Sequence, residues 1–185
     1  MKILIFLSVF MMGLFADSSA EDITDAFQIR NAKTGIPINL NRTSKIFNYQ
    51  NWFLNDLGID KKIRITDQHA DAFPFGYVQF MVAANVKMCL SIAPSGFLAL
   101  KDCKKDYESG EFETIFQIIP TDTAAVQLRS MVLKKNECLG IFTNPNVPIV
   151  DRVGLVDCVL EDIFSIEPAR LFTFTPPLLG ARVIR

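Results

Sequence analysis

The sequence predicts an all-β domain built from three repeats of about 50 residues each. The first observation is a tetrapeptide of pattern apolar-Gln-apolar-long that begins at residues 27, 78 and 126, so that it recurs after 51 and then 48 residues. The second is that turn residues, and no helical periodicity, separate the apolar segments. A fixed period of this length is typical of repeat proteins, in which one unit cannot bury its apolar face alone. The three copies are Phe27-Gln28-Ile29-Arg30, Val78-Gln79-Phe80-Met81 and Val126-Gln127-Leu128-Arg129.

The second and third repeats share further segments. Cys89-Leu90-Ser91-Ile92 returns as Cys138-Leu139-Gly140-Ile141, Lys101-Asp102-Cys103 returns as Val156-Asp157-Cys158, and residues 115–120 return as 163–168. The first repeat closes on Gln50-Asn51-Trp52. A lone tryptophan can stack on a sugar, but the matching phenylalanines favour a place in a shared core. We therefore expect one repeated core position with these members: Gln50, Trp52, Phe116 and Phe164.

Each repeat carries strand signals in order along the chain. Residues 26–30, 77–82 and 125–132 are rich in β-branched, aromatic and aliphatic side chains. A short helical turn is expected at 104–109, and we expect no other helix after the N-terminal segment. Three units are too few for a propeller, which has about four or more blades, and the chain lacks the polar caps of an open solenoid. We therefore expect a closed threefold arrangement.

The first residues read as a secretory signal peptide. Lys2 supplies the positive start, residues 3–15 are apolar, and cleavage is expected after Ala16 or after Ala20. We assign residues 1–16 (or 1–20) to the signal, 17–26 to a short flexible acidic tail, 27–175 to the folded domain and 176–185 to a C-terminal tail. The chain is then secreted, through the periplasm or in association with an outer membrane. The tail carries Asp17, Glu21, Asp22 and Asp25.

The charge balance argues against some functions. The chain has 19 basic and 20 acidic residues, and no basic stripe that would release counterions from a polyphosphate. We therefore expect no direct nucleic-acid partner. The single histidine, His69, has no evident catalytic partners, and no catalytic motif is present, so we expect neither an enzyme nor a cofactor.

Four cysteines in an exported chain suggest two disulfides with three possible connectivities. Cys89 and Cys103 occupy the same two places in the second repeat that Cys138 and Cys158 occupy in the third, while the first repeat has neither cysteine. The simplest pairing is therefore Cys89–Cys103 and Cys138–Cys158, each worth roughly 3 kcal/mol by closing a loop of about 15 to 20 residues. Free thiols or a metal site are the alternatives, but the spacings do not fit the close pairs of a four-cysteine zinc site.

Two resemblances extend this interpretation. Gln50-Asn51-Trp52 resembles the Gln-x-Trp signature of ricin B-type lectin β-trefoils, and the Cys-Leu-x-Ile and Asp-Cys segments resemble their disulfide-closed subdomains. Nearly the whole mature chain resembles the C subunit of the cytolethal distending toxins. The segments that carry this second resemblance are Phe73-Pro74-Phe75-Gly76-Tyr77-Val78-Gln79-Phe80, residues 124–130, residues 142–149 and Thr175-Pro176-Pro177-Leu178.

The resemblance implies a β-trefoil that serves a toxin of three chains. In that family, the A and C subunits are ricin-like trefoils that pair, bind the target cell and deliver the B subunit, a catalytic nuclease. The A subunit is often a lipoprotein, and the absence of a cysteine near the signal cleavage sites favours the C subunit. The expected partners are the A and B subunits of the toxin and a host-cell glycan or sterol-rich membrane. The alternative is a free-standing lectin that binds glycans without protein partners.

The resemblance also implies two candidate contact regions. The tail of the C subunit reaches the nuclease in this family, and an acidic tail would be attracted to a groove that binds polyanions. A sterol-recognition motif has been proposed for the C subunit, and Phe75 and Tyr77 lie in the corresponding stretch, although the strict pattern is not met. Phe75 and Tyr77 are thus the candidate membrane or receptor contacts.

Overall fold

A computed structural model describes residues 25–40, 46–93, 95–133, 135–148, 152–160 and 165–178. The expected signal peptide, Asp17, Glu21, Asp22 and Phe164 lie outside these ranges. Among the described residues, no helix is long and apolar enough to cross a bilayer. The elements are β1 (Gln28–Asn31), η1 (Phe47–Gln50), β2 (Trp52–Gly58), α1 (Lys61–Thr66), β3 (Tyr77–Val82), β4 (Asn85–Ile92), β5 (Leu98–Asp102), α2 (Cys103–Ser109), β6 (Phe116–Pro120), β7 (Val126–Ser130), β8 (Glu137–Ile141), β9 (Val153–Asp157), η3 (Pro168–Arg170) and β10 (Phe172–Thr175).

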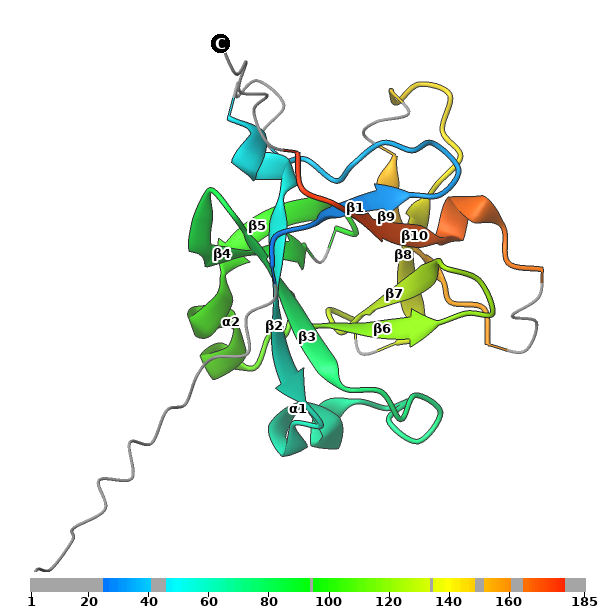
Figure 1. Ribbon diagram of the computed structural model, residues 1–185. Coiled ribbons are helices and arrows are strands. Elements are labelled where there is room, and N and C mark those ends of the chain that lie inside the picture. Colours follow the sequence, from blue (N-terminus) through cyan, green and yellow to red (C-terminus); the bar gives the residue numbers. More distant parts are fainter. Residues whose placement is uncertain are drawn as a thin grey trace, which may run out of the picture.

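Six strands close into a barrel, to which each repeat contributes two (Figure 1). The order is β1, β10, β7, β6, β3 and β2, with every neighbouring pair antiparallel. A bridge between Phe27 and Trp52 closes the ring, with their backbone N–H and C=O groups bonded at 2.9 and 2.7 Å. We call the three repeats the first unit (β1 and β2), the second unit (β3 to β6) and the third unit (β7 to β10).

Hairpins complete the second and third units. β4 pairs with β5, and β8 pairs with β9. The two hairpins meet at a bridge between Phe97 and Gly154, where a side chain on Gly154 would lie 3.0 Å from the carbonyl oxygen of Gly96. In the first unit, the described residues hold only a bridge between Arg30 and Pro37 at the corresponding place. The barrel and its hairpins form the β-trefoil that the sequence predicts.

The barrel interior holds the apolar residues of the repeated motif. Ile29, Phe80 and Leu128 follow the repeated glutamine and belong to the central core cluster. Because side chains alternate along a strand, the residues on either side of them face the outside of the barrel. The three glutamines themselves are nearly inaccessible to solvent: Gln28, Gln79 and Gln127.

The strand register gives the members of the repeated core position. Gln79 is paired with Asn55, three residues after Trp52, and Gln127 is paired with Ile119, three residues after Phe116. Gln28 is paired with Thr175, three residues after Phe172. The fully buried Phe172 therefore stands at the third place of the set, and Phe164, which was expected there, lies outside the described residues. Trp52 and Phe116 are fully buried as well, whereas Gln50 lies half-buried in η1.

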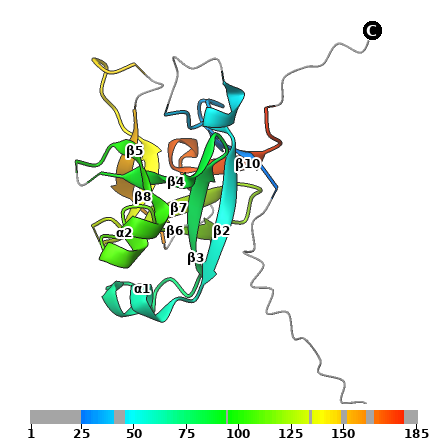
Figure 2. The same ribbon diagram turned by 90° about the vertical axis from the view of Figure 1, so that its left-hand side faces the viewer.

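Two short helices flank the barrel, and only one was expected. α2 covers the predicted helical turn and ends at Gly110, which adopts a left-handed backbone with φ of 76°. α1 was not predicted, because Ile63 is its only buried residue and six residues show no apolar period. It begins at Asp60, whose carboxylate accepts a hydrogen bond from the Ile63 N–H at 3.0 Å. Figures 1 and 2 show α1 beyond the ends of β2 and β3, close to α2.

Candidate binding site

The fourth residue of the repeated tetrapeptide lies on the outer face of the barrel in each unit: Arg30, Met81 or Arg129. The register makes these positions equivalent, because Met81 is paired with Cys89 and Arg129 with Cys138. We call the surface around each of them a wall site. The three wall sites share a backbone arrangement and differ in what covers them.

In the first unit, Arg30 covers its own wall site. Its Nε donates to the side-chain oxygens of Gln28 at 3.1 Å and Thr175 at 3.2 Å. Its Nη1 donates to the carbonyl oxygen of Gly35 at 2.6 Å. The guanidinium is thus held by two groups of its own unit and by Thr175 of the neighbouring strand β10.

In the third unit, a buried ion pair covers the wall site. Arg129 and Asp67 are both fully inaccessible to solvent, and the guanidinium binds the carboxylate through two hydrogen bonds of 2.6 and 2.8 Å. The Arg129 side chain also donates to Gln117 Oε1 at 2.6 Å and stacks 4.4 Å from the centroid of the Phe73 ring. Such bidentate, stacked geometry is what arginine provides and lysine does not.

This cluster also shifts the pKa of two groups, Asp67 and Tyr77. Burial alone would raise the pKa of Asp67, but the hydrogen bonds from Arg129 and from the His69 N–H hold it below its ordinary value. Tyr77 donates its hydroxyl to Asp67 Oδ2 at 3.0 Å. Burial, and then the nearby carboxylate, raise the pKa of Tyr77. The cluster is therefore a charged structural clamp at neutral pH.

The chain segment between the first and second units fills the rest of this wall site. Phe73 packs with Ile119 and the Cys138–Cys158 disulfide, with Phe75 at the edge of the cluster. Gln117 Nε2 donates to the carbonyl oxygens of Phe75 at 2.8 Å and Phe73 at 3.3 Å. Residues 67–75, a series of turns that carries a carboxylate and two aromatic rings, thus cover the third unit's wall site.

In the second unit the wall site is an open pocket. Met81 replaces the arginine; its side chain is 7% exposed, packs against Phe53 and the Cys89–Cys103 disulfide, and lines the pocket. The pocket has a volume of about 740 Å³ and is lined by residues of β2, β3, β4, α2 and the last residue of β5. Its lining residues are Asn55, Leu57, Gln79, Met81, Val86, Lys87, Asp102, Cys103, Lys104, Lys105, Tyr107 and Glu108.

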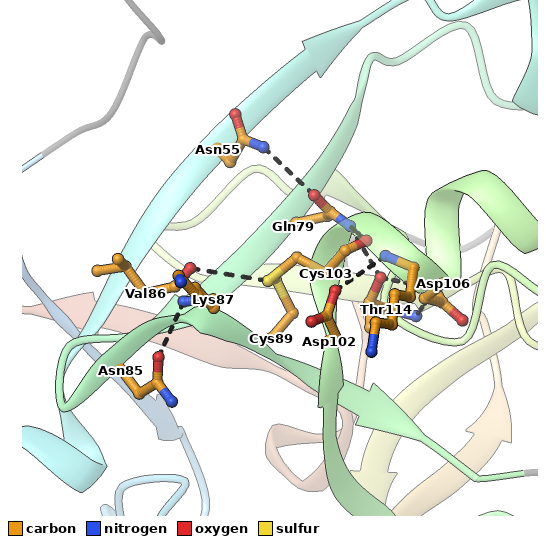
Figure 3. The surroundings of a disulfide bond; sticks show 11 residues. Asn55, Gln79, Asn85, Val86, Lys87, Cys89, Asp102, Cys103, Asp106 and Thr114 are labelled. Carbon is orange, nitrogen blue, oxygen red and sulfur yellow. Dashed lines mark hydrogen bonds between the residues drawn. A yellow bond between two sulfur atoms is a disulfide. The ribbon is translucent and has the colours of Figure 1, made fainter.

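The polar floor of the pocket is held in place. Gln79 Nε2 donates to Thr114 Oγ1 at 2.9 Å and to the Cys103 carbonyl oxygen at 3.1 Å. Its amide oxygen accepts from Asn55 Nδ2 at 3.3 Å. Figure 3 shows this chain of amides beside the Cys89–Cys103 disulfide, which packs against Met81. The floor is therefore preorganised, so little side-chain entropy is lost when a ligand binds.

The rim of the pocket carries three lysines against two carboxylates, those of Asp102 and Glu108. Lys87, Lys104 and Lys105 are exposed, and only Lys104 has an ionic partner among the described residues, a 3.7 Å contact with Glu108. Both members of that pair are exposed, so it contributes little to stability. Asp102 is engaged as the N-cap of α2, where it accepts from the Lys105 N–H at 2.9 Å. The rim thus offers ammonium groups to an anion.

The side of the pocket next to α1 is braced. Tyr107 donates its hydroxyl to Asp60 Oδ2 at 2.7 Å, and the Lys62 ammonium lies 4.5 Å from the centre of its ring. The hydrogen bond to Asp60, with burial, raises the pKa of Tyr107. These contacts tie α1 to α2 and hold the pocket wall rigid.

An acidic cluster behind α2 is not a metal site. Asp106, Glu111 and Glu113 lie close enough to share a cation, but the Lys101 ammonium occupies that place. It lies 3.0 Å from Asp106 and 2.9 Å from Glu113, and it also pairs with Glu111. Burial lowers the pKa of Lys101, but the three carboxylates outweigh this effect and raise it.

The structure places the predicted site residues as follows. Both expected disulfides, Cys89–Cys103 and Cys138–Cys158, are present. Asp25 is exposed where the tail meets the barrel. Phe75 is half-buried against the third unit. Tyr77 is fully buried, so its assignment as a membrane or receptor contact is wrong. The pocket was missed, although the sequence held one signal: the repeated motif ends in Arg, Met and Arg.

Comparisons with known proteins agree with this architecture. The family model of the cytolethal distending toxin A/C domain matches residues 26–183. A solved cytolethal distending toxin structure from Actinobacillus actinomycetemcomitans is 21% identical, with a TM-score of 0.59, over 86% of this chain and 90% of that one. A solved cytolethal distending toxin structure from Haemophilus ducreyi is 18% identical, with a TM-score of 0.60, over 86% of this chain and 90% of that one. The β-trefoil structure of BEL is 12% identical, with a TM-score of 0.50, over 87% of this chain and 97% of that one. No curated protein sequence matches significantly.

Proposed function

Because this chain belongs to the cytolethal distending toxin A/C domain family, we propose that it is a secreted, non-catalytic C subunit of a tripartite genotoxin. In this role it pairs with the A subunit, holds the nuclease (the B subunit) and helps the assembly attach to a host-cell glycan or sterol-rich membrane. The observation that carries the proposal is the family match over residues 26–183. The cysteines support the C assignment, since all four are bonded in the two disulfides and none of them is free to carry a lipid.

The fold suits a scaffold that binds other chains. The closed barrel, two disulfides and the buried Arg129–Asp67 pair hold its surfaces in one arrangement. Association with a preorganised surface costs less ordering entropy than association with a loose one. The chain's only histidine, His69, lies 6.5 Å ring to ring from Phe73 and belongs to the segment that covers the third wall site. This position suits packing rather than acid–base chemistry.

The acidic tail is proposed to help dock the nuclease. Residues 17–26 carry four carboxylates, and the tail leaves the barrel at Phe27, which is fixed to Trp52 by two backbone hydrogen bonds. Complementary charge would draw such a tail toward a groove that binds polyanions. Deleting residues 17–26 should therefore weaken retention of the nuclease while leaving the trefoil folded. Unchanged assembly and unchanged nuclease activity would remove this part of the proposal.

The proposal is tested by co-purifying the mature chain with candidate A and B subunits and then measuring cell binding. We expect an equimolar complex that binds cells better than any of its parts. A chain that stays monomeric and binds a glycan array instead would contradict the toxin role and support a free-standing lectin. Circular dichroism of the isolated chain controls for misfolding in either case.

A further inference from the structure

The third unit shows what kind of group a wall site accommodates. There the occupant is residues 67–75 of the chain itself, a series of turns that leads into β3 and brings a carboxylate, Asp67, and two aromatic rings, Phe73 and Phe75. Its backbone carbonyls are bonded to the side chain of Gln117. The second unit has the same register, a disulfide in the same place and no such occupant among the described residues. The pocket is thus an open copy of a site that the protein fills elsewhere with peptide.

We propose that the pocket at Met81 receives an acidic segment of a partner chain, with an aromatic or aliphatic side chain as its anchor. The inference rests on the proposed function, in which the chain assembles with other proteins, and it names the surface and the chemistry of one contact. The partner segment would take the place that residues 67–75 take in the third unit. No other chain segment among the described residues competes for that space.

The apolar part of the pocket fits such an anchor. Leu57, Met81 and Val86 line it together with the Cys89–Cys103 disulfide. Val86 is 49% exposed at the lip, close to the start of β4. Burying an apolar side chain there would remove both surfaces from water, which is the main favourable contribution to binding.

The rim fits the acidic part. In the third wall site, Arg129 supplies the cation that binds the carboxylate, but Met81 stands at that position in the second unit. The positive charge lies instead on the three lysines of the rim, of which Lys87 and Lys105 have no ionic partner among the described residues. A carboxylate would therefore be bound near the surface, where its attraction steers association and is weakened by salt.

The test compares two double charge reversals in the full assembly. Lys87→Glu with Lys105→Glu reverses the rim, and Lys33→Glu with Lys135→Glu makes the same charge change at exposed lysines outside the pocket. Assembly of each variant with the A and B subunits is measured by surface plasmon resonance at two salt concentrations. We expect the rim variant to weaken association by about tenfold or more and to lose most of its salt dependence, and the control to bind like the wild type.

Three results would overturn the proposal. If the rim variant and the control both kept the affinity of the wild type, no partner would use the pocket. If the rim variant assembled normally but no longer bound sialylated glycans on an array, the pocket would be assigned to an acidic sugar. Equal losses in both variants would show a general charge effect. Failure of the wild-type chain itself to assemble would instead refute the proposed function, so the two failures are distinct.

Discussion

The second and third wall sites differ although their backbones are equivalent. Both lie beside a disulfide, and both pair the fourth motif residue with the first cysteine of that disulfide. Their surroundings differ: Arg129 binds Asp67 under Phe73, whereas the buried Met81 lines an open pocket that α2 borders. The comparison teaches that a repeated fold can use one position for stability in one unit and leave it free for binding in another.

The largest expected effect comes from making the third wall site resemble the second. Arg129→Met would leave the Asp67 carboxylate buried without its cation, which typically costs about 3 to 5 kcal/mol in free energy of unfolding. Urea denaturation measures this cost. Adding Asp67→Asn should restore part of the loss, because the uncompensated charge is then removed. A loss below about 1 kcal/mol for Arg129→Met would mean that the clamp does not brace the domain.

Removing each disulfide in turn tests whether the two bonds stabilise their units by the same free energy. The bonded cysteines are separated by 14 residues in the second unit and by 20 in the third. Chain entropy predicts a cost of about 3 kcal/mol for each Cys-to-Ser pair, with the two costs equal to within about 0.5 kcal/mol. Chemical denaturation of both variants checks this. A much larger cost for Cys138 and Cys158 would show that their packing with Phe73 contributes more than loop closure.

Lowering the pH should remove the stabilisation that the Asp67 carboxylate provides at the third wall site. The folded-state pKa of Asp67 lies below its ordinary value, so its contribution is complete above the unfolded-state pKa of about 4 and is lost as pH falls through the folded-state pKa. The gap in unfolding free energy between the wild type and Asp67→Asn should therefore narrow as the pH is lowered from about 5 to 2. Denaturation at several pH values measures the gap. A gap that stays constant over this range would contradict the assigned role of the carboxylate.

The smallest stability effect is expected at the pocket. Val86→Ser should change the unfolding free energy by less than about 0.5 kcal/mol, because the side chain is half exposed. The same change should weaken assembly with the partner subunits if the anchor packs on Val86. Phe73→Ser is the matched change in the third unit, and its buried ring predicts a loss of about 3 kcal/mol or more. Comparable stability losses for both variants would refute the distinction between the sites.

The repeat made the fold predictable, because period, turn chemistry and cysteine positions all describe local features of each unit. The place of Phe172 could not be predicted for a physical reason. The sequence around Phe164 resembles that around Phe116, whereas only strand pairing puts Phe172 at the register position that matches Phe116. α1 escaped prediction because a short helix with one buried side chain leaves no periodic signal.

The sites were less predictable than the fold because their contacts join distant parts of the chain. Asp67 and Arg129 lie 62 residues apart, and the burial of Tyr77 depends on that pair. The one local clue was the change from arginine to methionine at residue 81. Only the strand register shows that this change occurs at equivalent places, and only the third unit shows what an occupied wall site looks like.

The most direct measurement places a photo-crosslinking amino acid at Val86 or at Lys135 in the assembled complex. Each residue lies three positions before the first cysteine of its unit, so the two variants probe equivalent edges of the open and the filled wall site. We predict that the group at residue 86 captures an acidic segment of one of the two partner subunits, identified by mass spectrometry, and that the group at 135 does not. Capture from both positions, or from 135 alone, would contradict the account.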